Sequence, residues 1–151
     1  MKKNLSKIML FLLLALIVSA LLAAAGCNTS FTSNGQRIYF TAASSSGVRI
    51  TYTGGPGGMM QGPLACVNCH GSEGHGGTVN FMMQTFDVPD ITWPTLTGQY
   101  EDHQPYSEET LKQAITQGVD PAGNSLEYPM PRWQMSAQDL NDLVAFIKTL
   151  K

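Results

Sequence analysis

Five consecutive residues constrain this chain more than any other feature: Cys66-Val67-Asn68-Cys69-His70. Two thiols three positions apart share one face of a helical turn, and an imidazole follows directly after the second. This spacing lets both sulfurs form thioethers with the two vinyl groups on one edge of a porphyrin, while His70 offers a ring nitrogen to the iron as the proximal ligand. The pentapeptide therefore predicts one covalent haem c, attached through Cys66 and Cys69.

Other interpretations of the cysteine pair fit less well. A redox-active pair would open a helix within a βαβ unit, and the flanking sequence has no such pattern. A zinc site would need two more Cys or His ligands at short spacing. His75 and His103 are present, but a second cysteine pair is not. A structural disulfide would suit an exported protein but would not require His70.

The first 26 residues predict export. Lys2, Lys3 and Lys7 precede an apolar run over residues 8–25 that only Ser19 interrupts. A basic start, an apolar stretch and small residues after it are typical of a secretory signal. The run is also long enough to span a membrane, so an uncleaved N-terminal helix is the alternative anchor.

Cys27 favours cleavage and lipidation. Ala25-Gly26-Cys27 resembles the lipobox of bacterial lipoproteins, although Ala24 stands where leucine is usual. Without lipidation, Cys27 would be a free thiol in an oxidising compartment. We therefore expect a signal peptide over 1–26, a lipidated tether over 27–34 and a folded domain over 35–151. Either anchor leaves the domain exported, on the outer side of the cytoplasmic membrane, in a periplasmic or other extracytoplasmic position.

The charge of the mature chain argues against a nucleic-acid partner. The leader takes three of the nine basic residues, which leaves six against eleven acidic residues and a net charge of −5. Proteins that bind nucleic acid carry basic surfaces instead.

Capping residues and apolar spacing predict three helices: one over 35–40 behind Ser33 or Asn34, one from Ser107 to Gly118, and one after Ser136. Alternating β-branched residues predict a short strand over 49–53, and 81–86 is expected to be a strand or a hairpin arm. Two prolines predict an irregular segment over 87–98.

From about Gly35 to its end, the chain resembles the class I c-type cytochromes, which are small mono-haem electron carriers. The motifs that carry the resemblance are the haem pentapeptide with Gly71, the helix end over 111–118, the segment 128–133 (Tyr-Pro-Met-Pro-Arg-Trp), and the final helix. The resemblance implies an all-α fold of short helices around one haem. It also implies that the first and last helices cross where Gly35 meets Phe146.

The resemblance also implies Met130 as the second axial ligand of the iron. A thioether is a suitable sixth ligand, and Pro129 and Pro131 restrict the backbone on both sides of it. A methionine is more often core filler, so competitors remain open. They are Met59, Met60, Met82, Met83, Met135, His75 and His103.

An insert over residues 40–65 departs from the family pattern. We expect it to be irregular or β-hairpin-like and to lie before the haem motif. A surface loop is the favoured interpretation. It could instead shape a partner site at a haem edge, or bind Cu(I) through Met59 and Met60.

The resulting functional hypothesis is a membrane-tethered electron carrier in a respiratory chain, rather than an enzyme. Its expected partners are membrane-bound redox complexes, with the membrane itself contacted through the lipid. The alternatives are a haem peroxidase or gas sensor, an accessory cytochrome subunit of an oxidase or reductase, and a thiol–disulfide protein. The apolar residues expected around the haem are Tyr39, Leu64, Phe86, Trp93, Leu96, Leu111, Trp133 and Phe146.

Overall fold

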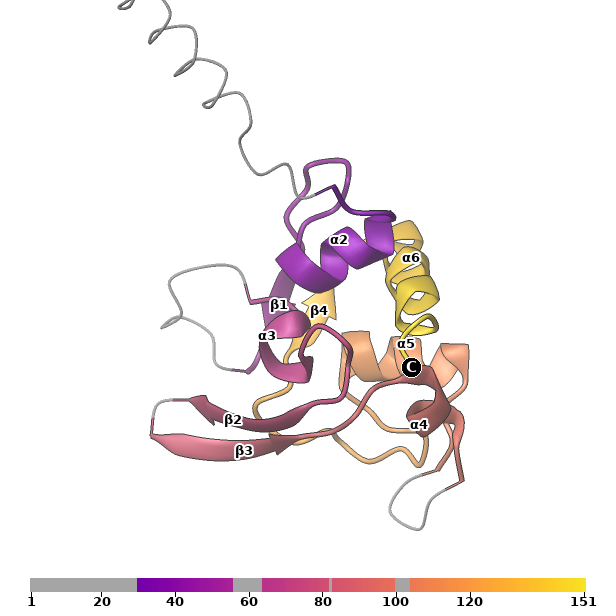
Figure 1. Cartoon of the computed structure of the whole chain (residues 1–151). Helices are drawn as coiled ribbons and strands as arrows, with labels where there is room; N and C mark the ends of the chain where they lie inside the picture. Colours follow the sequence, from indigo (N-terminus) through magenta and orange to yellow (C-terminus); the bar gives the residue numbers. More distant parts are fainter. Residues whose placement is uncertain (1–29, 56–63, 82, 100–103) are drawn as a thin grey trace, which may run out of the picture. The chain divides into compact units, whose positions relative to one another are not determined.

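The computed structural model describes residues 30–55, 64–81, 83–99 and 104–151 (Figure 1). Apart from Ser30, these residues belong to one compact unit, Phe31–Lys151. The predicted signal peptide and Cys27 lie outside the described residues, as do Met59 and Met60. In chain order the elements are α2 (Asn34–Thr41), β1 (Thr51–Thr53), α3 (Val67–His70), β2 (Gly77–Phe81), β3 (Gln84–Val88), α4 (Trp93–Thr97), α5 (Glu108–Gln117), β4 (Arg132–Gln134) and α6 (Ala137–Ile147).

The fold is mixed rather than all-α. Within the described ranges, five helices accompany two antiparallel sheets of two strands each. The helices agree with the small cytochrome fold that the resemblance implies, and the strands are additions to it.

In the described part of the insert before the haem motif, residues 40–55 and 64–65, the structure has strand β1 and an isolated antiparallel bridge between Ala43 and Arg49, which agrees with an irregular or β-hairpin-like insert. β1 pairs antiparallel with β4, with Tyr52 opposite Trp133 and their ring centroids 5.2 Å apart. A hairpin, β2–β3, follows the haem motif, with Gly77 opposite Val88, and it includes the range 81–86 that was expected to be a strand or a hairpin arm (Figure 1). A strand of three residues cannot satisfy its own backbone groups, so its partner is decided by what the tertiary fold places beside it.

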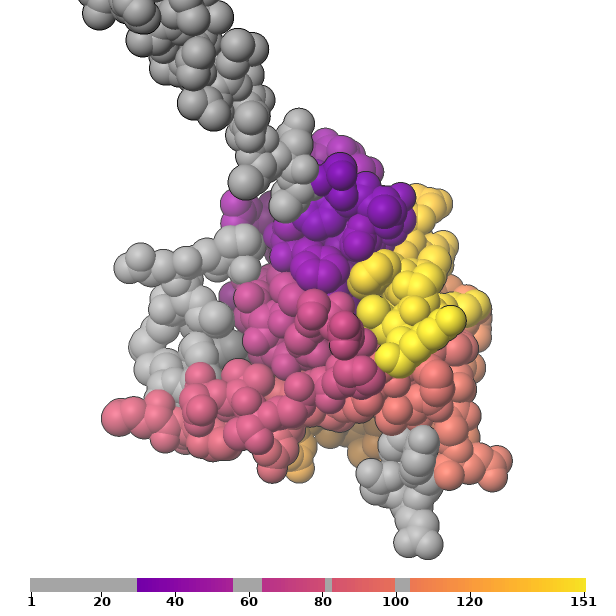
Figure 2. All heavy atoms as spheres, in the orientation of Figure 1, coloured from indigo at the N-terminus to yellow at the C-terminus, as the bar shows by residue number. Residues whose placement is uncertain are grey.

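Helices α2 and α6 cross in direct contact, as the resemblance implies (Figures 1 and 2). The crossing is so close that a Cβ on Gly35 would lie 1.8 Å from the backbone oxygen of Asp142 and 2.9 Å from Cβ of Phe146. Only a residue without a side chain fits this point. Ser33 caps α2 by accepting a hydrogen bond from the Gln36 amide, 3.0 Å away.

The helices predicted from their caps are confirmed. Ser107 and Thr110 form a reciprocal capping box at the start of α5, and Gly118 ends that helix with φ +68°. At α6, the Asp139 amide donates to Ser136 Oγ at 3.1 Å. These local hydrogen bonds satisfy amides that the first helical turn leaves unpaired.

Helix α4 corrects the prediction that residues 87–98 are irregular. Pro94 stands in the first turn of α4, where a missing amide hydrogen costs nothing because that amide has no partner within the helix. Proline therefore helps to begin this helix rather than breaking it.

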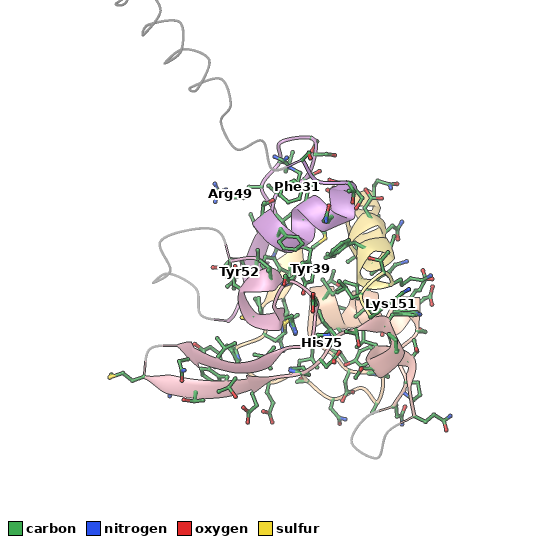
Figure 3. The ribbon with its side chains drawn as sticks, in the orientation of Figure 1. Phe31, Tyr39, Arg49, Tyr52, His75 and Lys151 are labelled. Carbon is green, nitrogen blue, oxygen red and sulfur yellow. The ribbon has the colours of Figure 1, made fainter. Side chains whose placement is uncertain are left out.

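The core lies between the helices. Tyr39, a residue of α2, is fully buried in it (Figure 3). Of the eight apolar residues expected around the haem, seven belong to the buried cluster or pack against it. Phe86 is the exception and is not part of this cluster. Its ring contacts Tyr128 instead, with the ring centroids 5.6 Å apart.

One buried carboxylate joins both ends of the folded domain. Asp139 is 9% exposed. Its Oδ1 accepts hydrogen bonds from Asn34 at 3.0 Å and Ser44 at 2.7 Å, and its Oδ2 accepts one from Ser136 at 2.7 Å. Hydrogen bonds, led by the one from Asn34, outweigh the effect of burial and lower the pKa of Asp139.

We expect Asp139→Asn to lower the free energy of unfolding at pH 7 by about 2 kcal/mol, since hydrogen bonds to a charged group contribute about 1.5–3 kcal/mol. Because the folded-state pKa is depressed, the charged form stabilises the fold above the unfolded pKa of about 4, and this contribution is lost as pH falls through the folded pKa. The difference between wild type and variant in urea unfolding should therefore shrink below pH 4. Asp87→Asn is the control, because Asp87 is exposed and accepts from Thr78 at 3.2 Å. Equal losses in the two variants would contradict this role.

Candidate functional site

The cysteine pair lies on a single helical turn, as its spacing predicts. Cys66 occupies the N-cap of α3, and the His70 amide donates to the Cys66 carbonyl at 2.9 Å. Asn68 stabilises the turn by accepting the Ala65 amide at 2.7 Å. Cys66 and Cys69 are both half-buried free thiols, so both sulfurs are available for thioether bonds.

Burial keeps these thiols protonated. It raises the pKa of Cys66 to about 12 and also raises the pKa of Cys69. A thiol–disulfide oxidoreductase needs the opposite, namely a depressed pKa that yields a thiolate at neutral pH. The electrostatics of this turn therefore do not favour the thiol–disulfide alternative.

His70 is buried, 6% exposed, and its ring orientation is set by a backbone group. Its Nδ1 lies 3.1 Å from the carbonyl oxygen of Pro89. A carbonyl only accepts, so Nδ1 carries the proton and donates, which leaves the lone pair on Nε2. Burial, which outweighs that hydrogen bond and the charge of Asp90, lowers the pKa of His70 and keeps the ring neutral. A neutral imidazole whose other nitrogen donates to a carbonyl is the usual state of a histidine that ligates a metal.

The end of the haem motif is attached to the first helix. The hydroxyl of Tyr39 donates to the carbonyl of Gly71 at 2.7 Å, and Tyr39 points from α2 toward α3 (Figure 3). Burial raises the pKa of Tyr39, so it remains a neutral donor. Gly71 leaves the turn with φ +75°, a conformation that glycine adopts without strain.

Met130 lies in the loop between α5 and β4, half-buried and packed against the same apolar cluster that Cys66 and Val67 border. Its amide donates to the Glu127 carbonyl at 3.1 Å. Its own carbonyl accepts a hydrogen bond from the guanidinium of Arg132. The two members of the predicted axial pair thus come from segments that border one core.

The competitors for the sixth position lie in other surroundings. His75 is exposed, with Nδ1 3.0 Å from Asp90 Oδ2 and Nε2 4.0 Å from Glu73 Oε2. Those carboxylates, with the hydrogen bond to Asp90 as the main cause, raise the pKa of His75, which disfavours the neutral form that a ligand needs. Met83 is fully exposed at the hairpin turn, whereas Met135 packs against the core. Met59, Met60, Met82 and His103 lie outside the described residues.

Sequence reasoning missed three residues of this region. Pro89, the acceptor for His70, and Gly55, whose backbone contacts the Met130 loop, lie 19 and 75 positions from those ligands and have no motif of their own. Arg132 belongs to the segment 128–133 that carries the resemblance, but no rule of spacing identifies it as a clamp on neighbouring carbonyls.

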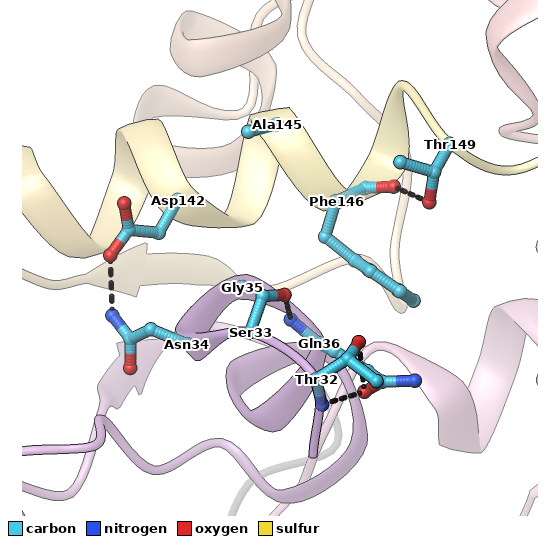
Figure 4. Close-up of a pocket in the computed structure, with 9 residues that line it drawn as sticks. All are labelled: Thr32, Ser33, Asn34, Gly35, Gln36, Asp142, Ala145, Phe146 and Thr149. Atoms are coloured by element: carbon cyan, nitrogen blue, oxygen red, sulfur yellow. Dashed lines mark hydrogen bonds between the residues drawn. The ribbon is translucent and has the colours of Figure 1, made fainter.

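A surface groove of about 520 Å³ lies at the crossing of α2 and α6, lined by residues such as Asn34, Gly35 and Asp142 (Figure 4). Of the residues expected around the haem, Phe146 lines it, but Cys66, Cys69, His70 and Met130 do not. Its floor is the close helix contact, with Asn34 donating to Asp142 Oδ2 at 2.7 Å, so it is a product of the packing rather than of the haem motif.

Two kinds of feature are absent from the described residues. No helix in these ranges is both long and apolar enough to cross a bilayer. Likewise, no three His, Cys, Asp or Glu side chains in this part of the chain gather as a metal-binding cluster.

Comparison with known proteins gives one match. The family model described as Cytochrome c matches residues 33–151, which runs from the N-cap of α2 to the end of the chain. No curated protein and no solved structure matches the chain.

Proposed function

The chain belongs to the cytochrome c family, and from that premise we propose that it is a membrane-tethered electron carrier whose haem iron is ligated by His70 and Met130. Membership brings covalent haem c and electron transfer with it. The tether, the respiratory setting and the ligand residues are the proposal.

The donor set on α3 fits a covalent haem. Cys66 and Cys69 are free, and the lone pair of the buried His70 ring is on Nε2 because Nδ1 faces the Pro89 carbonyl at 3.1 Å. This oriented, neutral imidazole one position after the second thiol is the observation that carries the proposal, because it equips one turn with two attachment points and one iron ligand.

When bound, the haem supplies a one-electron Fe(III)/Fe(II) couple. Cys66 and Cys69 would hold its edge through thioether bonds, and the Pro89 carbonyl holds His70 in one tautomer and one orientation. The Met130 thioether is the proposed sixth ligand, and Met/His ligation raises a reduction potential. If His70 and Met130 both held the iron, no position would remain open for a substrate; this arrangement suits an electron carrier, whereas a peroxidase needs an open position.

Charges on the described surface bear on the choice of partner. Lys148 is paired with Glu108 and lies 5.4 Å from the Trp93 ring, and the mature chain is acidic. A lysine-rich docking ring is therefore not the proposed mode. We propose that the partners are redox complexes of the same membrane, contacted through apolar and glycine-rich surface or through acidic patches that meet a basic partner. Electron-transfer encounters of this kind use small interfaces.

One expression experiment tests these proposals together, with the full chain and Cys27→Ala produced in a bacterium that matures c-type cytochromes. The wild-type chain should appear as a red protein of the membrane fraction, with haem that resists acid–organic extraction. Its ferrous form should not bind carbon monoxide at neutral pH, and respiratory substrate added to the membranes should reduce it.

Each readout can fail separately. Extractable haem would contradict the covalent attachment. Prompt and complete carbon monoxide binding would favour the peroxidase or gas-sensor alternative. Wild type in the soluble fraction would reject the tether, whereas Cys27→Ala remaining in the membrane would favour an uncleaved helix over the lipid. A membrane-bound haem that no respiratory substrate reduces would contradict the proposed partners.

A further inference from the structure

We propose that the insert acts through residues 51–55 as a brace for the loop that carries Met130, and that the Arg132 side chain clamps the same loop through its carbonyls. Met130 is itself a proposed ligand, so the brace rests on the proposed function. The insert then has a role in holding the sixth ligand, rather than being a surface loop without effect on the site.

The first support is strand pairing directly beside the ligand. β1 and β4 pair with Thr53 opposite Arg132, which is two residues after Met130. Tyr52 packs on Trp133 with ring centroids 5.2 Å apart, and Trp133 is 4% exposed. The insert therefore anchors the C-terminal end of the Met130 loop through both backbone pairing and a buried aromatic contact.

The second support is a backbone contact with the two prolines that flank Met130. A Cβ on Gly55 would lie 2.8 Å from the carbonyl oxygen of Pro129 and 3.0 Å from Cβ of Pro131. The backbone of the insert therefore packs closely against Pro129 and Pro131, the residues on both sides of Met130. A side chain at position 55 would not fit without moving them. The neighbouring Gly54 has φ +69°, close to the +66° of Gly55, but nothing within 4 Å of its Cβ position.

The third support is the Arg132 side chain. Its guanidinium donates to the carbonyls of Met130, Leu126 (2.9 Å) and Gly118 (3.3 Å). Gly118 makes room for it, since a Cβ there would lie 2.0 Å from Nε of Arg132. A planar fork of five donors can join several carbonyls in one geometry, which a lysine cannot.

Together these contacts restrict the loop at its two prolines and at its carbonyl groups. A ligand held in place before it binds loses less conformational freedom when the bond forms, so the bond is effectively stronger. The brace should therefore keep the sixth position filled and raise the barrier to its replacement by an external ligand. Gly55 and Arg132 are positioning residues, because they act through Met130.

The test compares Gly55→Ala with Gly54→Ala in the haem-loaded full chain. Both variants place alanine at nearly the same positive φ, so backbone strain is matched, and only Gly55→Ala forces the Met130 loop to move. We expect the ferrous Gly55→Ala protein to bind carbon monoxide roughly tenfold faster or more than Gly54→Ala, because an added group against packed backbone shifts it. The weak near-infrared band of a Met–Fe(III) bond should weaken only in Gly55→Ala.

Arg132→Lys provides an independent variant that keeps the charge. It should also speed carbon monoxide binding, whereas Arg49→Lys, at an exposed position in the insert, should leave it unchanged. Circular dichroism establishes that each variant is folded at the temperature of the measurement. The brace is rejected if Gly55→Ala and Gly54→Ala behave alike while wild type shows the near-infrared band. If wild type lacks that band, the ligand assignment fails instead.

Discussion

A Met130→Ala variant is expected to lose the near-infrared Met–Fe(III) band completely, to bind carbon monoxide promptly in the ferrous state, and to show a lower reduction potential. The fall should be on the order of 0.1 V or more, because axial ligands tune haem potentials over about 0.8 V and a thioether favours the reduced iron. Absorption spectra and a redox titration measure these quantities.

Met135→Ala is the matched control, since Met135 also packs against the core. It should lose some stability through lost packing but keep the band and the potential. A band that persists in Met130→Ala would show that another side chain serves as sixth ligand. Met59, Met60 and Met82, outside the described residues, would then be tested in turn.

The largest effect on stability is expected for Gly35→Ala. The added methyl group would lie 1.8 Å from the Asp142 oxygen and 2.5 Å from the Asp142 carbonyl carbon, and both are backbone atoms. Helices α2 and α6 would have to separate, so we expect the free energy of unfolding to fall by about 3 kcal/mol or more. Thermal or urea unfolding of the haem-loaded protein measures the change.

A double variant separates this backbone contact from side-chain crowding. Phe146 Cβ lies 2.9 Å from the Gly35 Cβ position, and the Phe146 ring also contacts Tyr39. Because the shortest contacts are to the backbone, Phe146→Ala should not rescue Gly35→Ala. A double variant more stable than Gly35→Ala would contradict this explanation and indicate that the Phe146 side chain sets the limit.

Features that depend on neighbours in the chain could be predicted. Two thiols and an imidazole within five residues define the haem turn, because one helical turn brings them to one side. Ser33, Ser107 and Ser136 could be assigned as caps, because a cap acts on amides two or three residues away. The Gly35–Phe146 crossing was also predicted, but from the resemblance rather than from any local signal.

Features that depend on partners far along the chain could not be predicted in the same way. A short strand was expected over 49–53 and forms over 51–53, yet its pairing with 132–134 was not expected, because a three-residue strand carries no information about its partner. A strand or hairpin arm was expected over 81–86, but this range contains parts of both arms, β2 and β3, because their last pair is Phe81 with Gln84. Helix α4 was missed because proline was read as a breaker, although Pro94 stands in a first turn, where proline is favoured.

The amino-acid sequence alone determined the covalent haem, since its attachment needs only Cys66, Cys69 and His70 within five residues, on one helical turn. The tertiary structure decided how His70 is held, because its partner Pro89 comes from 19 residues away. It also decided what surrounds Met130, because Gly55 comes from 75 residues away and because Arg132 joins the carbonyls of Met130 and Gly118, 12 residues apart. A side chain's identity gives its chemistry, but its orientation and protonation depend on contacts that only folding makes.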